Sequence, residues 1–282
     1  MKVAETVNEV REFLKTHKST GQTTGLVPTM GALHEGHLSL IRQAKKENDL
    51  VVVSIFVNPT QFGPDEDFDL YPRVFDDDLL KCKDAGVDLV FHPAPEEMYT
   101  QHKTYIQVED LSRKLCGVSR PIHFRGVCTI VAKLFNITHP DRAYFGQKDA
   151  QQLLIIKKMV KDLNFDVDIV GCPIIREEDG LAKSSRNRYL NDQERKDATV
   201  LYRAIEEGKH LIRKDMTATD LTHAMEAVIK TVPSARIDYL EVVDMDTLEA
   251  VETIDRDVLV AMAVYLGSAR LIDNFIYSVS HE

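Results

Sequence analysis

The sequence predicts an α/β protein, with a doubly wound parallel sheet followed by a smaller α+β C-terminal domain. Apolar strand-like runs alternate with helix-like segments up to about position 175, a pattern typical of parallel strands with helices on both faces. After position 188 come two helix-like segments and then three strand-like runs separated by polar turns. That order favours an antiparallel sheet. We therefore predict two domains, residues 1–175 and 176–282.

The first domain alternates its predicted elements. Strands are expected over 23–30, 49–57, 87–91, 142–145 and 165–170, and helices over 36–48, 72–85, 125–136 and 149–162. The segment 125–136 is amphipathic, because its apolar residues recur at helical spacing along one stripe. Folds of this kind bind ligands beyond the carboxyl ends of their strands, so the loops that follow the strands are candidate sites.

The second domain is predicted because the elements no longer alternate: two helices come first, and three strands follow. Helices are expected over 192–213, with Asp192 as the candidate N-cap, and over 217–231. Strands are expected over 237–243, 258–266 and 271–279. The segment 183–187 lies in a polar loop near the start of this domain.

Composition excludes several classes of function. The chain of 282 residues has a net charge of −10, which argues against a nucleic-acid partner because phosphate backbones require clustered positive charge. No signal-peptide core follows Met1, and the longest apolar runs are too short to span a bilayer. The four cysteines lack zinc-ligand spacing and imply no disulfide framework. We expect a cytoplasmic protein with no membrane partner.

The segment His34-Glu35-Gly36-His37 is the first candidate for chemistry, because it lies between a predicted strand and a predicted helix. A helix N-terminus offers unpaired N–H groups and a positive dipole end, which suit a phosphate. Gly36 allows close approach to the backbone, and two imidazoles three residues apart can donate to phosphoryl oxygens. The alternative is a helix cap with surface histidines, and the tetrapeptide alone does not decide between them.

Two further segments carry groups that suit a nucleotide, although the sequence has neither a P-loop nor a Gly-x-Gly-x-x-Gly motif. In the segment 145–149, Gly146 permits close approach, Lys148 can neutralise a phosphate, and Asp149 can bind a ribose hydroxyl or simply cap the helix. The segment 183–187 combines a lysine, two serines and an arginine, which is a dense set of phosphate donors. Its alternative is an exposed linker.

Amides and carboxylates follow other predicted elements. Asn58 and Gln61 come just after the strand 49–57 and can orient a small polar substrate, with Phe62 as an apolar wall. Asn58-Pro59 is also a common turn signal. Asp77 and Asp78 are candidates to hold Mg²⁺ with nucleotide phosphates, and the acidic first turn of a helix explains them equally well.

Four segments taken together resemble the pantothenate synthetase family. They are VPTMGALHEGH at 27–37, FVNPTQF at 56–62, FGQKDAQQ at 145–152 and SSRN at 184–187. His-x-Gly-His alone marks the broader nucleotidyltransferase superfamily, whereas these four segments in this order, with a resemblance over essentially the whole chain, are far more specific. The resemblance implies ATP-dependent condensation of (R)-pantoate with β-alanine to give pantothenate, AMP and pyrophosphate. It also implies a Rossmann-like N-terminal domain, a smaller C-terminal domain, dependence on Mg²⁺ and a homodimer.

The resemblance also implies roles for individual residues. His34, His37, Lys148 and Arg186 are the expected catalytic residues. The expected ATP-binding residues are Met30, Gly31, His34, Gly36, His37, Gly146, Lys148, Asp149, Ile175, Lys183, Ser184, Ser185 and Arg186. Pantoate and β-alanine are expected at Asn58, Gln61, Gln152, Met30 and Phe62. Lys183 departs from the family, which often has an apolar residue such as Met there, so it is expected to face solvent and receives no catalytic role.

The expected chemistry leaves two alternatives open. A carboxylate resists attack by an amine, so ATP must first convert pantoate to an acyl-adenylate, and no nucleophilic side chain is required. One alternative is a nucleotidyltransferase that joins a nucleotide to a phosphorylated alcohol and releases no AMP. The other is a nucleotide-sensing module without catalysis. A tRNA-acting role is disfavoured by the net charge.

Overall fold

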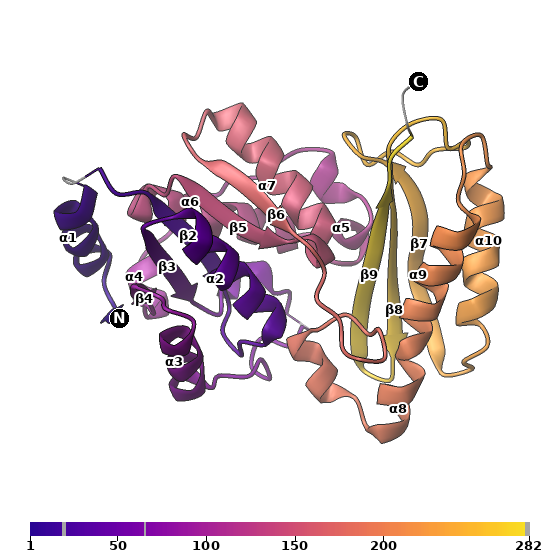
Figure 1. Cartoon of the computed structure of the whole chain (residues 1–282), viewed down its shortest axis with the longest axis horizontal. Coiled ribbons are helices and arrows are strands. Elements are labelled where there is room, and N and C mark those ends of the chain that lie inside the picture. Colours follow the sequence, from indigo (N-terminus) through magenta and orange to yellow (C-terminus); the bar gives the residue numbers. More distant parts are fainter. Residues whose placement is uncertain (19–20, 65, 280–282) are drawn as a thin grey trace. The chain divides into compact units, whose positions relative to one another are not determined.

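The computed structural model describes residues 1–18, 21–64 and 66–279 and divides the chain into two compact units (Figure 1). The N-terminal unit consists of Met1–Arg113, Gly117–Gln147 and Gln151–Pro173. The C-terminal unit consists of Lys114–Cys116, Lys148–Ala150 and Ile174–Glu282.

The N-terminal unit is built on a parallel sheet of six strands, in the order β1-β4-β3-β2-β5-β6. The strands are β1 Lys2–Ala4, β2 Thr24–Thr29, β3 Leu50–Ile55, β4 Leu89–Phe91, β5 Arg142–Gly146 and β6 Asp168–Cys172. From β2 the chain winds outward to β3 and β4, whereas β5 and β6 lie on the other side of β2. The strand order therefore reverses between β2 and β5, and in open α/β sheets ligands bind beyond the strand ends at such a point.

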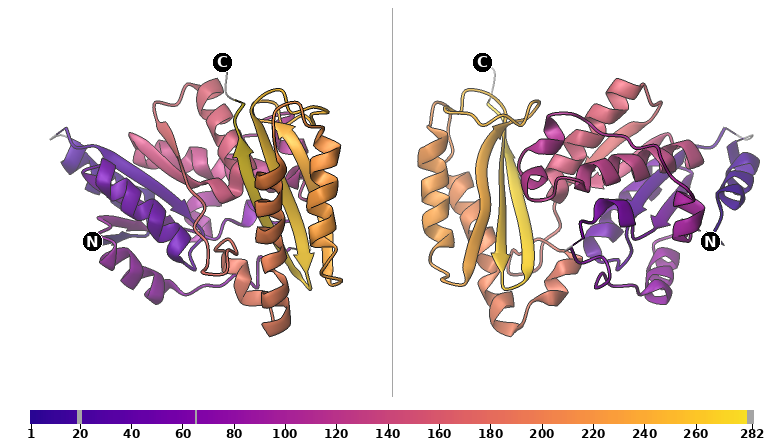
Figure 2. Two further views of the ribbon diagram at one scale, coloured as in Figure 1. Left: turned by 45° about the vertical axis from the view of Figure 1, so that its right-hand side comes forward. Right: turned by 180° about the vertical axis from the view of Figure 1, so that it is seen from behind.

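Helices cover both faces of this sheet, with α2 and α6 on opposite sides (Figures 1 and 2). The helices are α1 Val7–Lys18, α2 Glu35–Glu47, α3 Phe75–Asp84, α4 Pro95–Tyr99, α5 Cys116–Ser119, α6 His123–Thr138 and α7 Ala150–Leu163. Short 3-10 turns occur at η1 Pro59–Gln61, η2 Leu111–Arg113 and η3 Gln147–Asp149. Leu40, Ile41 and Ala44 of α2 pack on Val27 and Val51 of the sheet.

The predicted doubly wound α/β fold is confirmed, with differences at the N-terminus. No element was predicted before position 23, but β1 pairs with β4 and α1 follows it. A strand of three residues carries too little periodicity to be recognised from sequence. None of the helices in the described part of the chain combines the length and apolarity that a membrane span requires.

The C-terminal unit has an antiparallel sheet, in the order β7-β8-β9, with two long helices along it (Figure 2). The strands are β7 Ala235–Asp244, β8 Val258–Leu266 and β9 Ala269–Tyr277. The helices are α8 Asp192–Asp197, α9 Thr199–Leu211 and α10 Ala218–Ile229, with a 3-10 turn, η4, at Ser185–Tyr189. Leu201 and Ile205 of α9 and Leu221 and Met225 of α10 form the core with the sheet. The predicted α+β class is confirmed.

Two local predictions in the C-terminal unit were wrong. The expected single helix over 192–213 is two helices that meet at Ala198, where the amide N of Leu201 bonds the Ala198 carbonyl three residues back. The N-cap of α8 is Asn191 and not Asp192. Asn191 accepts from the backbone of Glu194, and the Glu194 side chain accepts from the Asn191 N–H, so the two form a capping box.

Candidate active site

The two motif histidines close a capping box at the start of α2. His34 is the N-cap, and its Nδ1 accepts a hydrogen bond from the Gly36 amide at 3.1 Å. Nδ1 of His37, at position N3, accepts from the His34 amide at 3.3 Å. A capping box satisfies two of the amides that a helix N-terminus leaves unpaired. The helix cap, which was the alternative to a phosphate site, is therefore present, and it is built by the histidines themselves.

The cap fixes the chemistry of both rings. Because Nδ1 accepts from a backbone N–H in each histidine, the ring proton of the neutral form lies on Nε2. The ring centroids of His34 and His37 are 4.1 Å apart, so the two imidazoles form one cluster. A Cβ added at Gly36 would lie 2.8 Å from Cε1 of His34. The position of the His34 ring is therefore itself a reason for glycine here.

Asp78 organises the loop that leads into α2. Its carboxylate is buried and accepts from the amides of Ala32 at 2.8 Å and Leu33 at 2.7 Å. Burial raises the pKa of this carboxyl, while the two amides act in the opposite direction. Gly31, with φ of +83°, adopts a left-handed conformation beside this carboxylate, which glycine favours. Asp78 thus sets the path of the chain between β2 and His34.

This geometry does not favour the predicted role of Asp77 and Asp78 in binding Mg²⁺. Both Asp78 oxygens already accept backbone amides, and Asp77 pairs with Lys81 at 2.6 Å. Mg²⁺ requires several oxygen ligands in octahedral geometry. Among the described residues no group of three or more His, Cys, Asp or Glu side chains could hold a metal ion.

Replacing Asp78 by asparagine separates a structural role from a metal role. We expect Asp78→Asn to lower the free energy of unfolding by about 1–3 kcal/mol, because a buried amide loses its acceptor. The resemblance implies that activity depends on Mg²⁺, and the Mg²⁺ concentration for half-maximal activity should not change. Chemical denaturation and a Mg²⁺ titration measure these quantities, with the more exposed Asp77→Asn as the control. A raised Mg²⁺ requirement in either variant would instead support the metal role.

A second polar cluster follows β3. Asn58 caps η1, and its Nδ2 donates to Oε1 of Gln61 at 3.0 Å and to the Gly126 carbonyl at 3.1 Å. Nε2 of Gln61 lies 3.0 Å from Sδ of Met30. The structure thus brings together three of the residues expected to bind pantoate, Asn58, Gln61 and Met30. Both amide side chains are buried.

The backbone of Gln61 is held separately from its side chain. Its carbonyl accepts from Nδ1 of His123 at 3.0 Å and from Arg120 at 3.4 Å, and Arg120 pairs with Glu66. Neither His123 nor Arg120 was found from the sequence, because partners about 60 positions away leave no local pattern. Beside Gln61, the buried Phe62 packs edge-on against Phe68 and Tyr71, as an apolar wall would.

The other predicted substrate residue, Gln152, lies in the first turn of α7 and is half-buried. Its neighbour Gln151 is buried and donates to the Leu111 carbonyl at 2.9 Å. Gln151 therefore has a structural bond, and Gln152 stays the predicted substrate residue of the pair. The hydrogen bonds of Asn58 and Gln61 described above do not include Gln152.

Residues after β5 present a charged pair. Nζ of Lys148 lies 3.3 Å from Oδ2 of Asp149, and Nδ2 of Asn274 holds the Lys148 carbonyl at 2.9 Å. A Cβ added at Gly146 would meet no atom of the described residues within 4 Å, its two chain neighbours apart. That open space agrees with the predicted approach of a ligand.

The segment that contains Ile175 and Lys183 is a small hairpin in the C-terminal unit. The Lys183 amide donates to the Ile175 carbonyl at 2.9 Å, and Arg176 pairs with Ala182 in an antiparallel bridge. Arg176 also forms two hydrogen bonds, at 2.6 and 3.0 Å, to the fully buried carboxylate of Asp273 on β9. A buried bidentate pair fixes geometry strongly, so this hairpin is anchored to the sheet.

The predicted phosphate-binding serines follow the hairpin. Ser184 is the N-cap of η4, and its Oγ accepts from the Arg186 amide at 3.3 Å. Ser185 is buried, and Arg186 is half-buried. The side chain of Lys183 does not extend into solvent as expected, because its Nζ lies 2.7 Å from Oε2 of Glu177.

The ion pair between Lys183 and Glu177 leads to a prediction for position 183, where the sequence departs from the family that it resembles. The resemblance implies that an adenylate forms, and Lys183→Met should leave its rate of formation within about threefold, because a partly exposed ion pair contributes only about 0–1 kcal/mol. Pyrophosphate release with pantoate measures that rate. Glu177→Gln is the control that removes the same pair and keeps the lysine. A loss of about 100-fold in Lys183→Met alone, the scale of a lost transition-state donor, would give Lys183 a direct catalytic role.

Fold and site together define an α/β enzyme whose Rossmann-like unit carries a polar cluster at the strand ends. The chain matches the sequence model of the pantoate-beta-alanine ligase family over residues 2–276. It is 58% identical over 275 residues to the pantothenate synthetase of Clostridium novyi strain NT, covering 97% of each chain. The crystal structure of pantothenate synthetase from Thermus thermophilus superposes with a TM-score of 0.93 at 45% identity, covering 98% of this chain and 99% of that one.

A further solved structure is pantoate-beta-alanine ligase from Francisella tularensis, in complex with beta-gamma ATP and beta-alanine. It is 34% identical, covers 98% of this chain and 97% of its own, and has a TM-score of 0.81. The chain therefore belongs to the pantoate-beta-alanine ligase family. This confirms the resemblance that the sequence motifs suggested and the predicted class of enzyme, a ligase.

Proposed function

We propose that this chain uses ATP to join (R)-pantoate to β-alanine through a pantoyl-adenylate. The observation that carries the proposal is the family match over nearly the whole chain, together with the histidine pair at the start of α2. The ATP and β-alanine complex of the Francisella relative supports the choice of substrates.

In the first step, a pantoate carboxylate oxygen attacks the α-phosphorus of ATP, and the bond from that phosphorus to the bridging oxygen of pyrophosphate breaks. Negative charge grows on the phosphoryl oxygens and on the leaving pyrophosphate. The Nε2–H groups of His34 and His37 are suited to donate to those oxygens, because the cap keeps the proton on Nε2. Preformed donors of this kind require little reorganisation during the reaction.

The family resemblance assigns further residues to ATP. Lys148 and Arg186 would neutralise phosphate charge, and Ser184 and Ser185 would donate hydrogen bonds to it. Gly146 and Asp149 would meet the ribose. The remaining assigned residues are Met30, Gly31, Gly36, Ile175 and Lys183.

Pantoate is assigned to the cluster after β3. The amides of Asn58, Gln61 and Gln152 would bind its hydroxyl and carboxylate oxygens, and Met30 and Phe62 would contact its carbon skeleton. In the second step, the β-alanine amine attacks the carbonyl carbon of the adenylate, the bond from that carbon to the AMP oxygen breaks, and the amine proton passes to solvent. No covalent enzyme intermediate is needed.

Three further parts of the proposal follow from the same resemblance. Mg²⁺ is expected to arrive as the counterion of the ATP phosphates and to offset their charge. The active form is a homodimer, which light scattering of the pure protein tests. We place the reaction in the cytoplasm, where ATP is made available.

Product analysis tests the proposed activity. The purified protein should release pyrophosphate when given ATP and pantoate, and should release AMP catalytically only when β-alanine is added. A nucleotidyltransferase that stops after nucleotide transfer would release no AMP. Binding of ATP without pyrophosphate release in the presence of pantoate would support the non-catalytic binding module and refute the proposal.

A further inference from the structure

One buried hydrogen-bond cluster fixes which end of the Gln61 amide faces away from Asn58. The Gly126 carbonyl can only accept and the Thr60 amide can only donate, and these contact opposite ends of the Asn58 side chain. Nδ2 of Asn58 must therefore donate, and the group it meets on Gln61, at 3.0 Å, must be Oε1. The NH₂ group of Gln61 is left on the Met30 side.

Sδ of Met30, at 3.0 Å from Nε2 of Gln61, is a weak hydrogen-bond acceptor. The Gln61 NH₂ therefore retains donor capacity for a better acceptor, such as a carboxylate or hydroxyl oxygen. The orientation of Asn58 thus decides whether Gln61 offers a donor or an acceptor to its ligand.

Tyr99, the last residue of α4, holds this orientation from the side opposite Gln61. Its hydroxyl donates to Oδ1 of Asn58 at 2.7 Å, which is shorter than the bonds from the Thr60 hydroxyl at 3.0 Å and the Thr60 amide at 3.4 Å. Burial raises the pKa of the Tyr99 hydroxyl to about 12, so it stays a neutral donor across the physiological range.

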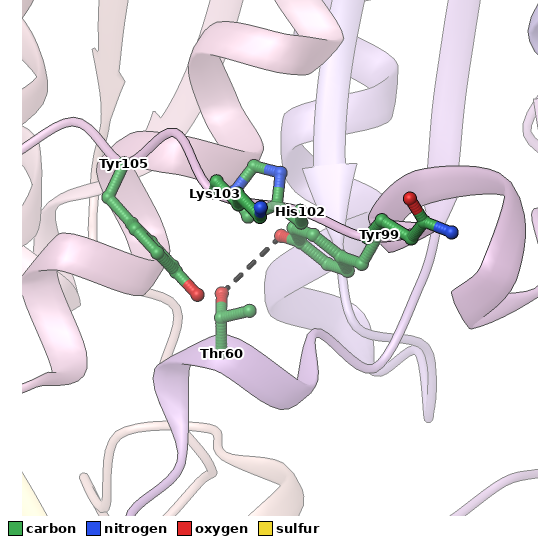
Figure 3. A pocket seen from close by; sticks show the side chains of 6 residues that line it. Thr60, Tyr99, His102, Lys103 and Tyr105 are labelled. Atoms are coloured by element: carbon green, nitrogen blue, oxygen red, sulfur yellow. Dashed lines mark hydrogen bonds between the residues drawn. The ribbon is translucent and has the colours of Figure 1, made fainter.

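The Tyr99 ring lines an open pocket with Thr60, Gln101, His102, Lys103 and Tyr105 (Figure 3). In the figure the Tyr99 hydroxyl lies beside Thr60, and the dashed line joins the two oxygens, which are 3.4 Å apart. The ring is held by an edge-on contact with His102 at 4.9 Å and by Phe56 at 6.1 Å. These ring contacts do not involve the hydroxyl, so a phenylalanine retains them.

We propose that Tyr99 is a positioning residue for pantoate. It acts through Asn58 to keep the Gln61 NH₂ directed at an acceptor oxygen of the substrate. This inference rests on the proposed function, because that function makes pantoate the substrate that Gln61 binds. Tyr99 itself need not touch pantoate.

The first test is Tyr99→Phe, which removes one hydroxyl and leaves the ring. We expect the KM for pantoate to rise about 3- to 10-fold, the effect of losing one hydrogen bond. The KM values for ATP and β-alanine and the temperature of unfolding should stay close to those of the wild type. Tyr105→Phe is the matched control, since it removes a hydroxyl from the same pocket that makes no bond to Asn58.

The second test asks whether Tyr99 acts through Gln61. In a Gln61→Ala background, the Tyr99→Phe change should have almost no further effect on kcat/KM for pantoate, because the amide that Tyr99 orients is gone. If Tyr99→Phe and Gln61→Ala lowered kcat/KM for pantoate by independent factors that multiply, the proposal would be overturned. Equal KM values for pantoate in Tyr99→Phe and the wild type would also overturn it. If the wild-type protein released no pyrophosphate with pantoate, the proposed function itself would fail.

Discussion

Replacing His37 by alanine is expected to lower the rate of adenylate formation by about 10²–10³-fold, the usual effect of removing a preformed donor to transition-state charge. The affinity for pantoate should change by no more than about twofold, because the Nε2–H bond is assigned to ATP and strengthens as charge develops. Rapid-quench measurement of pyrophosphate, with pantoate varied, separates the two quantities.

The His37→Gln variant provides the control. Glutamine is a preferred residue at the third position of a capping box, so it can keep the bond to the His34 amide while removing the imidazole N–H. We expect Gln and Ala to lose activity equally, but only Ala to lose about 0.5–1.5 kcal/mol of stability with the cap. Full activity in the Gln variant would mean that His37 serves only to cap the helix.

The second large effect is expected from Gly126→Ala in α6. A Cβ at this position would lie 2.4 Å from the Thr60 carbonyl oxygen and 2.5 Å from the Gln61 amide nitrogen. Backbone atoms cannot rotate away, so η1 must move. We expect a loss of about 1–3 kcal/mol of stability. We also expect the KM for pantoate to rise by about 10-fold or more, because the Asn58–Gln61 cluster moves with η1 and its bonds to the substrate are lost. Denaturation and steady-state kinetics measure the two effects.

Gly208→Ala in α9 is the matched control for this substitution. It is also a helical glycine, but its added Cβ would meet mainly the flexible end of Met225, at 2.7 Å. Alanine has the higher helix propensity, by roughly 1 kcal/mol, so this variant should be nearly neutral and should keep the KM for pantoate. An unchanged pantoate KM in Gly126→Ala would show that the position of η1 does not control that site.

Much of the fold could be predicted from sequence because its strands are continuous apolar runs. The run at 49–57 contains β3, Leu50–Ile55, and the order of helices and strands after position 188 matches the C-terminal unit. The sequence predictions were wrong where an element is too short to show a pattern, or where two neighbouring residues carry the same capping signal. β1 has three residues, and Asn191 and Asp192 are both good cap residues, so only the hydrogen bonds distinguish them.

The candidate site was predictable to the extent that its residues lie in continuous motifs at strand ends. The segments around His34 and Asn58 are of this kind. What the motif could not reveal is that His34 is itself the N-cap and that its Nδ1 is already occupied. That finding changes the role of the histidines, since the cap and the proposed phosphate contact use different ring nitrogens.

The supporting residues could not be predicted. Tyr99 lies 41 positions from Asn58, and Gly126 lies 68 positions from it. Neither residue type stands out in its own segment, because a tyrosine at a helix end and a glycine in a helix have many ordinary explanations. Their importance comes from contacts across the fold, which only the three-dimensional structure reveals.

Isotope transfer tests the central claim, that pantoate is activated by direct attack on the α-phosphorus of ATP. Pantoate labelled with ¹⁸O in its carboxylate is incubated with the protein, ATP, Mg²⁺ and β-alanine, and the AMP is analysed by mass spectrometry. We expect one ¹⁸O atom in the phosphate of each AMP formed and none in pyrophosphate. Unlabelled AMP, or label in pyrophosphate, would contradict direct attack.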